Sequence, residues 1–383
     1  MKRMHVSLVS DHTIPNILAI EEFEPDELLL VSTKKMEDKG KAGHILECLA
    51  DRGLDYHNRH HILTVAEDSL LDCHRKLESW VEGRKASEFI VNLTGGNKIM
   101  SIAAYAFFKD YGSRMIYIPI PRNEYIMPFP KGGAQKPVML SQRLSVAEYL
   151  KAYGLTTLNT RHLEGMAKEA RERRELSHLI VARYEKLKAL LEKLGEVLRP
   201  HRGDREFVLK ETFSGATNEA KELMRRMNFS LKGVEAEKCL TKSEIQFLTG
   251  GWLEEYCFNE VFAYRGKGVD DVVIGIQIKN QKGTDNEFDV MFTKDNALYT
   301  VECKSLEQQE DKGTEALYKV AALQKDFGLR VGSFLVSTSP YILKNGVVRP
   351  SIAARAEHLN TEVVAPHEVV NFRQHLTDKL KLN

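Results

Sequence analysis

A regular alternation of strand-like and helix-like segments over residues 1–120 constrains the fold of this chain more than any other feature. Apolar and β-branched runs predict strands at residues 4–10, 28–33, 62–66, 88–94 and 114–120. Segments with helical periodicity lie between them, at residues 14–22, 41–52, 69–82 and 98–110. This alternation predicts a parallel, Rossmann-like α/β sheet, and right-handed crossovers give the strand order 3-2-1-4-5.

The predicted order makes the first and fourth strands neighbours at a switch point, where ligands of such sheets bind. Thr94-Gly95-Gly96-Asn97-Lys98 connects the fourth strand to its helix. Two glycines allow the backbone to approach a ligand closely, and the helix N-terminus together with Lys98 attracts an anion. We therefore predict a nucleotide-type ligand. Its predicted binding residues are Ser10, Asp11, His12, Thr13, Thr33, Thr94, Gly95, Gly96, Asn97 and Lys98.

A simpler interpretation of the same loop stays open. Gly95 and Gly96 can form a tight turn between strand and helix, with Thr94 or Asn97 as the helix cap. The loop is neither a Walker A motif nor a dinucleotide fingerprint, because both the GxxxxGK[ST] and the GxGxxG spacings are absent.

The length of 383 residues predicts two domains and a connector. Proline and glycine are concentrated in residues 121–160, which marks a boundary, and residues 165–198 predict one long charged helix. We predict a ligand-binding domain at residues 1–140, a helical linker region at 141–235 and a second α/β domain at 236–383.

The last domain is predicted to hold a mixed sheet. Helices are expected at residues 241–249, 252–261, 314–327 and 351–359, and strands at 271–278, 286–292, 298–303 and 332–337. The second and third of these strands form a hairpin, because Lys294, Asp295 and Asn296 between them are turn residues.

The hairpin carries the predicted catalytic site. Glu302 and Lys304 project from one face of their strand, and Asp289 approaches them from the partner strand. Oxygen ligands from Asp289, Glu302 and the backbone carbonyl of Cys303 suit Mg²⁺ or Mn²⁺, and Lys304 would orient or deprotonate a water molecule. In the simpler interpretation, Glu302 and Lys304 form an ordinary ion pair.

Composition excludes several classes of protein. The net charge of +1 gives no global attraction to nucleic acid, so any basic surface must be local. The five cysteines lie far apart and predict neither a zinc site nor a disulfide framework. The chain starts without a signal-peptide pattern and has no apolar run of membrane-spanning length, so we expect a cytoplasmic enzyme or regulator with no membrane contact.

The order of acidic residues resembles that of the PD-(D/E)xK nuclease superfamily, in which a helix glutamate precedes an aspartate and then Glu-x-Lys. The matching residues are Glu254, with Glu255 as the alternative helix acid, then Asp289, Glu302 and Lys304. The proline of the family pattern is replaced by Phe288. The N-terminal domain, with its loop from Thr94 to Lys98, resembles the CARF sensor domains, and the two domains together resemble the CARF nuclease effectors of type III CRISPR systems.

This resemblance implies a homodimeric endonuclease that is activated by a cyclic oligoadenylate, with cyclic tetraadenylate favoured, and that cleaves single-stranded DNA or RNA in antiviral defence. Lys319, on the helix expected after the hairpin, would neutralise backbone phosphate. Two other functions remain as alternatives: a nucleotide-sensing regulator that binds nucleic acid without cutting it, and a restriction or repair nuclease that needs no ligand.

Overall fold

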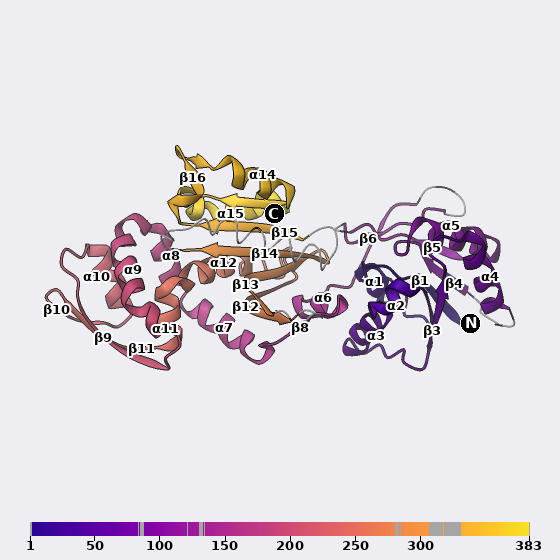
Figure 1. The fold of residues 1–383 in the computed structure, drawn as a ribbon, viewed down its shortest axis with the longest axis horizontal. Coiled ribbons are helices and arrows are strands. Elements are labelled where there is room, and N and C mark those ends of the chain that lie inside the picture. The colour runs from indigo at the N-terminus through magenta and orange to yellow at the C-terminus, as the bar shows by residue number, and fades with distance from the viewer. Residues whose placement is uncertain are drawn as a thin grey trace.

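The computed structural model describes residues 2–382 except 83, 85–87, 121, 130–132, 134, 280–282, 284, 306–316 and 318–330. The chain is elongated, with the N-terminal sheet at one end, the C-terminal sheet in the middle and a helical region at the other end (Figure 1). The helix predicted at residues 314–327, and with it Lys319, lies outside the described residues.

The N-terminal domain contains five parallel strands in the order β3-β2-β1-β4-β5, which confirms the predicted topology. The strands are β1 (Arg3–Leu8), β2 (Glu27–Thr33), β3 (His60–Val65), β4 (Glu88–Asn92) and β5 (Arg114–Ile116). The helices are α1 (Ile14–Phe23), α2 (Lys34–Asp38), α3 (Lys41–Asp51), α4 (Leu70–Val81) and α5 (Lys98–Phe108).

Two apolar layers enclose this sheet. The helices α1 and α3 pack on the face that carries Leu28 and Leu30, and α4 and α5 pack on the opposite face with Leu29 and Val31. Strand β5 is shorter than predicted because the chain leaves the sheet at Tyr117, which forms an isolated antiparallel bridge with Ile126. The short strands β6 (Glu124–Tyr125) and β7 (Val138–Met139) follow.

The prediction of one long helix over residues 165–198 was wrong. The chain forms α6 (Val146–Ala152), β8 (Thr156–Thr157), α7 (Thr160–Glu172), α8 (Arg174–Ala182) and α9 (Tyr184–Leu198). The breaks fall at Arg173 and Arg183, whose backbones leave helical geometry. They allow α8 to pack on the C-terminal domain and α9 to pack on α10 (Asn218–Arg226), and each helix then buries a different face.

A small antiparallel sheet closes the helical region. It contains β9 (Glu206–Thr212), β10 (Ser230–Lys232) and β11 (Glu235–Thr241) in the order β10-β11-β9. The helix predicted next to it is present as α10. Strand β11 leads directly into α11 (Lys242–Gln246), where Thr241 and Glu244 form the predicted capping box.

The C-terminal domain holds a six-stranded mixed sheet in the order β18-β15-β14-β13-β12-β8, which confirms the predicted fold class. Its strands are β12 (Asp271–Lys279), β13 (Asp285–Lys294), β14 (Ala297–Lys304), β15 (Gly332–Ser337), β18 (Thr361–Val364) and β8 from the connector. Helices α12 (Trp252–Phe262) and α15 (Phe372–Leu380) pack on one face. The remaining elements are β16 (Leu343–Lys344), β17 (Val347–Val348) and α14 (Pro350–His358).

None of the helices in the described part of the chain is long and apolar enough to cross a membrane.

Candidate active site and ligand loops

The hairpin β13–β14 has the geometry that its turn residues favour. Asp295 and Asn296 connect the strands, and their φ angles of +50° and +58° are those of a type I′ turn. Phe292 and Tyr299 stack across the strands with ring centroids 5.1 Å apart. The turn and this aromatic pair fix the register, so the positions of Asp289, Glu302 and Lys304 follow from it.

The strand ends far from this turn bring the predicted catalytic residues together. Val290 pairs with Val301, so Asp289 lies beside Glu302. Oδ2 of Asp289 accepts a hydrogen bond of 2.7 Å from the backbone N–H of Cys303, which holds the carboxylate at the strand end. Lys304 Nζ lies 3.8 Å from Oε2 of Glu302, which is 1% exposed.

Burial of Glu302 distinguishes this pair from an ordinary surface ion pair. Burial lowers the pKa of the Lys304 ammonium, but Asp289 and Glu302 outweigh that effect and raise the pKa above its ordinary value. Lys304 is therefore a cation at neutral pH and is suited to stabilise negative charge on a phosphate. In this state it orients a water molecule but does not deprotonate it.

Glu254 joins the site from the first turn of α12. The chain enters this helix through Gly250, whose φ of +135° favours glycine and where a Cβ would lie 2.5 Å from Oγ of Ser305. The start of α12 is thus held against the residue that follows Lys304. Sequence analysis noted the Gly250-Gly251 pair but gave no reason for it, and this close approach supplies one.

The pKa of Glu254 indicates how closely negative charges converge here. Burial raises this pKa, and the carboxylates of Asp289 and Glu287 raise it further, to about 8. Arg202 and Lys304 act in the opposite direction. Carboxylates that raise each other's pKa are a common feature of functional sites.

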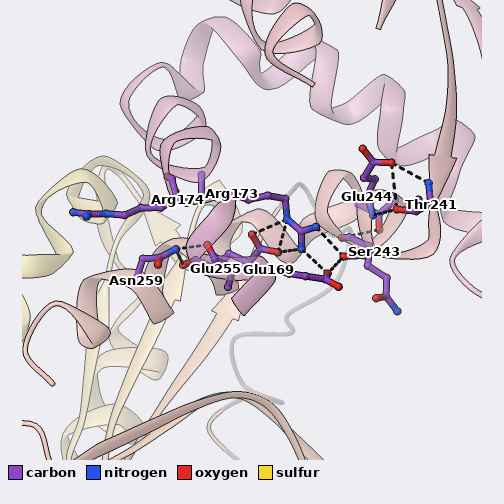
Figure 2. Close-up of polar contacts among 12 residues, drawn as sticks. Glu169, Arg173, Arg174, Thr241, Ser243, Glu244, Glu255 and Asn259 are labelled. Carbon is purple, nitrogen blue, oxygen red and sulfur yellow. Dashed lines mark hydrogen bonds and ion pairs between the residues drawn. The ribbon is translucent and has the colours of Figure 1, made fainter. Parts of the chain in front are cut away.

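Glu255, the alternative helix acid, is engaged elsewhere (Figure 2). Both of its carboxylate oxygens accept hydrogen bonds of 3.1 Å from Nε of Arg173, and Nη2 of Arg173 donates to the same group. Burial raises the pKa of Glu255 while Arg173 lowers it, and the pairing raises the pKa of Arg173. Because a guanidinium keeps its proton at any ordinary pH, the pair is ionised.

This ion pair anchors the kink between α7 and α8 to the C-terminal domain. Nη1 of Arg173 donates to Oγ of Ser243 over 2.8 Å, and Glu169 contacts both residues (Figure 2). Nδ2 of Asn259 donates to the carbonyl of Ala170 over 2.8 Å. Glu254 and Glu255 therefore have different surroundings, and only Glu254 is coupled to Asp289.

The donor set suits a hard divalent cation, although it is not arranged as a finished cage. Among the described residues, no three His, Cys, Asp or Glu side chains are grouped closely enough to hold a metal ion. Burial raises the pKa of the Cys303 thiol well above its ordinary value, so a thiolate ligand is disfavoured and the carbonyl remains its available ligand group. The raised pKa of Glu254 is the effect expected where carboxylates lack a cation between them.

At the N-terminal switch point, the loop after β4 combines both interpretations of the sequence. Gly95 approaches β1 so closely that a Cβ would lie 1.9 Å from the carbonyl oxygen of Leu8. Asn97 caps α5 by accepting a hydrogen bond of 2.9 Å from the N–H of Met100. Thr94 accepts from the N–H of Ile118 over 2.8 Å. These contacts are those of a tight, capped turn.

The predicted ligand residues differ in what they can contact. Lys98 is exposed at the first turn of α5, and Gly96 is partly exposed with a φ of +69°. Thr33 is buried, at 7% exposed. Ser10 accepts a 3.3 Å hydrogen bond from the N–H of His12. Burial lowers the pKa of His12, so this imidazole is neutral at pH 7.

Two loop residues hold other parts of the chain. Thr13 donates a hydrogen bond of 2.6 Å to the carbonyl of Ala152 on α6, and Asp11 pairs with Lys39 over 2.6 Å. Sequence analysis missed the role of Thr13, because the contact spans 139 residues. It also weighed the arginines of residues 199–205 as phosphate contacts and preferred a solvated turn, whereas Arg202 reaches the field of Glu254.

Comparisons with known proteins agree with this architecture. Residues 4–149 match the model of the Card1 CARF domain, and residues 241–383 match that of the Card1-like endonuclease domain. No curated protein sequence matches the chain.

Solved structures share the fold over the whole chain. The protein VC1899 from Vibrio cholerae is 18% identical with a TM-score of 0.80, and 99% of this chain and 98% of that chain are covered. Can2 from Sulfobacillus thermosulfidooxidans, in complex with cyclic tetra-adenylate, is 20% identical with a TM-score of 0.77, and 99% of each chain is covered.

A type III CRISPR defence DNA nuclease activated by cyclic oligoadenylate is 17% identical with a TM-score of 0.51, and the match covers 93% of this chain and 52% of that one. The predicted combination of domains is confirmed: the chain belongs to the proteins that join a CARF domain of the Card1 type to a Card1-like endonuclease domain.

Proposed function

We propose that the protein is an endonuclease of CRISPR defence that is activated by a cyclic oligoadenylate, depends on a divalent metal ion, and cleaves single-stranded DNA or RNA. The observation that carries the proposal is the convergence of Glu254, Asp289, Glu302 and Lys304 at one end of the hairpin, in an endonuclease domain that is joined to a CARF domain. The two nucleases named above, one bound to cyclic tetra-adenylate and one activated by cyclic oligoadenylate, support the choice of activator.

Asp289, Glu302 and the carbonyl of Cys303 would hold Mg²⁺ or Mn²⁺. When bound, such an ion acidifies a water molecule and neutralises charge on the scissile phosphate. The protein's own contribution is positional. The hydrogen bond from the Cys303 N–H aims the Asp289 carboxylate, and Lys304 presents an ammonium to the developing negative charge. Glu254 orients water beside the ion.

The activator would bind at the carboxyl ends of β1 and β4. Lys98 and the N-terminus of α5 face this point with positive charge, and Ser10 and His12 lie on the neighbouring loop. A cyclic oligoadenylate repeats its phosphates around a ring, so a two-fold symmetric pocket between two copies of the chain suits it, and we propose a homodimer.

The connector gives the ligand a physical route to the nuclease. Thr13, in the loop after β1, is bonded to Ala152 at the end of α6. The segment before α6 is bonded to the hairpin turn, since the N–H of Leu144 donates to Oδ1 of Asn296 over 2.9 Å and Thr293 donates to the carbonyl of Leu144 over 2.8 Å. A shift of α6 would therefore move the hairpin that carries Asp289 and Glu302.

Cleavage assays on labelled single-stranded DNA and RNA, with Mn²⁺ and with or without each cyclic oligoadenylate, test this function. We expect activator-dependent cleavage that Glu302→Gln abolishes while activator binding persists. Equal cleavage with and without every activator would instead support a ligand-independent nuclease, and full activity of Glu302→Gln would refute the site.

A further inference from the structure

A pocket beside the catalytic strands is not used by the chemistry described above. It encloses about 370 Å³ and lies between the α8–α9 junction, the start of α12 and the segment before α15. Its wall is mostly apolar. The lining residues used below are Arg183, Tyr184, Trp252, Thr338, His367 and Val370.

The pocket is joined to the active site through the backbone. Thr338 directly follows β15, whose last residue, Ser337, pairs with Lys304. The N–H of Thr338 donates a hydrogen bond of 2.9 Å to the carbonyl of Lys304. Trp252 lies two residues before Glu254 on α12 and projects from another side of that helix. The pocket therefore opens next to the acidic cluster and not over it.

One buried polar atom in this wall lacks a partner. Trp252 is 0% exposed, and within the described part of the chain its indole Nε1–H has no hydrogen-bond acceptor. A buried N–H without an acceptor carries a free-energy cost, so an occupant of the pocket with an acceptor atom gains a hydrogen bond there. The ring of Tyr184 lies 5.6 Å from that of Trp252 and adds a second aromatic surface.

The mouth of the pocket carries the opposite chemistry. Arg183 and His367 are exposed there, and Val370 is 55% exposed at its edge. A flat, mainly apolar occupant with ring acceptors and an attached phosphate matches both parts: the ring fits the aromatic interior, and the phosphate meets Arg183. A nucleobase of a single strand has this combination of groups.

We propose that this pocket holds one unstacked nucleobase of the substrate, in the nucleotide next to the scissile phosphate, with Trp252 Nε1–H donating a hydrogen bond to a ring or carbonyl acceptor. The proposal rests on the proposed function, since it assumes a single-stranded nucleic acid at the Glu302 site. It explains how a site with no base contacts of its own would select unpaired strands: a base held in a stacked duplex cannot enter the pocket.

Two kinds of variant test the pocket. Val370→Phe places a ring across the mouth from an exposed position, so the fold is not at risk, and Val347→Phe on β17 is its matched control because Val347 is 65% exposed and does not line the pocket. Trp252→Phe removes the donor and keeps the ring. The substrates are oligonucleotides with one abasic nucleotide moved stepwise along the strand.

For the wild type and Val347→Phe, we expect an abasic nucleotide at one position beside the cleaved bond to lower kcat/KM by about tenfold. Val370→Phe should show the same loss with the intact strand and no further loss with the abasic one, and Trp252→Phe an intermediate loss. Uniform sensitivity along the strand, or Val370→Phe cleaving as Val347→Phe does, would overturn the proposal.

A binding measurement separates failure of the pocket from failure of the proposed function. The chain has two tryptophans, so in the double variant Trp80→Phe, Glu302→Gln the fluorescence reports on Trp252 alone. We expect an oligonucleotide, bound as judged by its own anisotropy, to change this emission, and an abasic strand to change it less. Unchanged emission at saturation would overturn the pocket even if the wild type cleaves, and absent cleavage with changed emission would reject only the nuclease.

Discussion

Neutralising either of two adjacent glutamates on α12 should change stability in opposite directions. Glu254 sits among carboxylates that raise its pKa from an ordinary 4.5 to about 8, whereas Glu255 is paired with Arg173. Glu254→Gln removes a repelled charge, and Glu255→Gln leaves a buried guanidinium without its main counter-charge. The first should stabilise the metal-free protein and the second should destabilise it.

The size of the first effect follows from the pKa. A shift from 4.5 to about 8 corresponds to about 4 kcal/mol at pH 7.5, at about 1.4 kcal/mol per unit. Glu254 is partly exposed, so water screens the repulsion and we expect about 1–2 kcal/mol of stabilisation. For Glu255→Gln we expect a loss of about 1–3 kcal/mol, because Glu169 still contacts Arg173.

The sign of the pH dependence is also fixed. Between pH 4.5 and about 8, the folded chain holds a proton on Glu254 that the unfolded chain has lost. Stability of the wild type should therefore fall as pH rises through this interval, and Glu254→Gln should remove that contribution.

Urea unfolding of the metal-free protein at pH 6 and pH 8, followed by tryptophan emission, measures both effects. Glu254→Gln should raise the midpoint at pH 8 more than at pH 6, and Glu255→Gln should lower it at both values. Destabilisation by Glu254→Gln at pH 8, or a neutral Glu255→Gln, would refute the assignment of the two residues.

Three further predictions concern the ligand, the turn and the connector. Mn²⁺ binding, measured by calorimetry in buffers of different ionisation enthalpy, should release close to one proton at pH 7 from the wild type and fewer from Glu254→Gln; equal release would contradict the coupling of the site. Gly95→Ala should destabilise the chain by about 2 kcal/mol or more in thermal unfolding because its Cβ meets the Leu8 carbonyl at 1.9 Å, while Gly43→Ala, with open space around it, should not; equal melting would contradict this turn. Asn296→Gly keeps a turn with positive φ but removes the contact with Leu144, so stimulation by the activator should fall about tenfold with activator affinity unchanged, whereas Asn345→Gly in the exposed β16–β17 turn should stimulate normally; full stimulation of Asn296→Gly would reject the route through the connector.

Much of the fold followed from local patterns in the sequence. The five-stranded order, the hairpin register and the capping box at Thr241 each depend on residues that are close in sequence or on general rules of chirality. The broken helix did not follow, because its periodicity continues through Arg173 and Arg183. The breaks come from packing against α12 and from the bond between Arg173 and Glu255, which are 82 residues apart.

The candidate site was predictable for the same reason and to the same extent. Asp289, Glu302 and Lys304 belong to one hairpin, so their proximity follows from strand alternation. The choice between Glu254 and Glu255 depends on which side of α12 meets the sheet, and the local sequence gives no strong periodic signal there, since both sides of this helix are buried. The partners Arg173 and Arg202 reach it from the connector and could be found only from the fold.

The central claim is that the hairpin is a nuclease site whose activity depends on a ligand in the other domain. Cleavage of a labelled single strand by the wild type and by Glu302→Gln, with Mn²⁺ and with or without cyclic tetraadenylate, tests it most directly. We predict cleavage only by the wild type and only with the activator. Equal wild-type cleavage without the activator, or undiminished cleavage by Glu302→Gln, would contradict the claim.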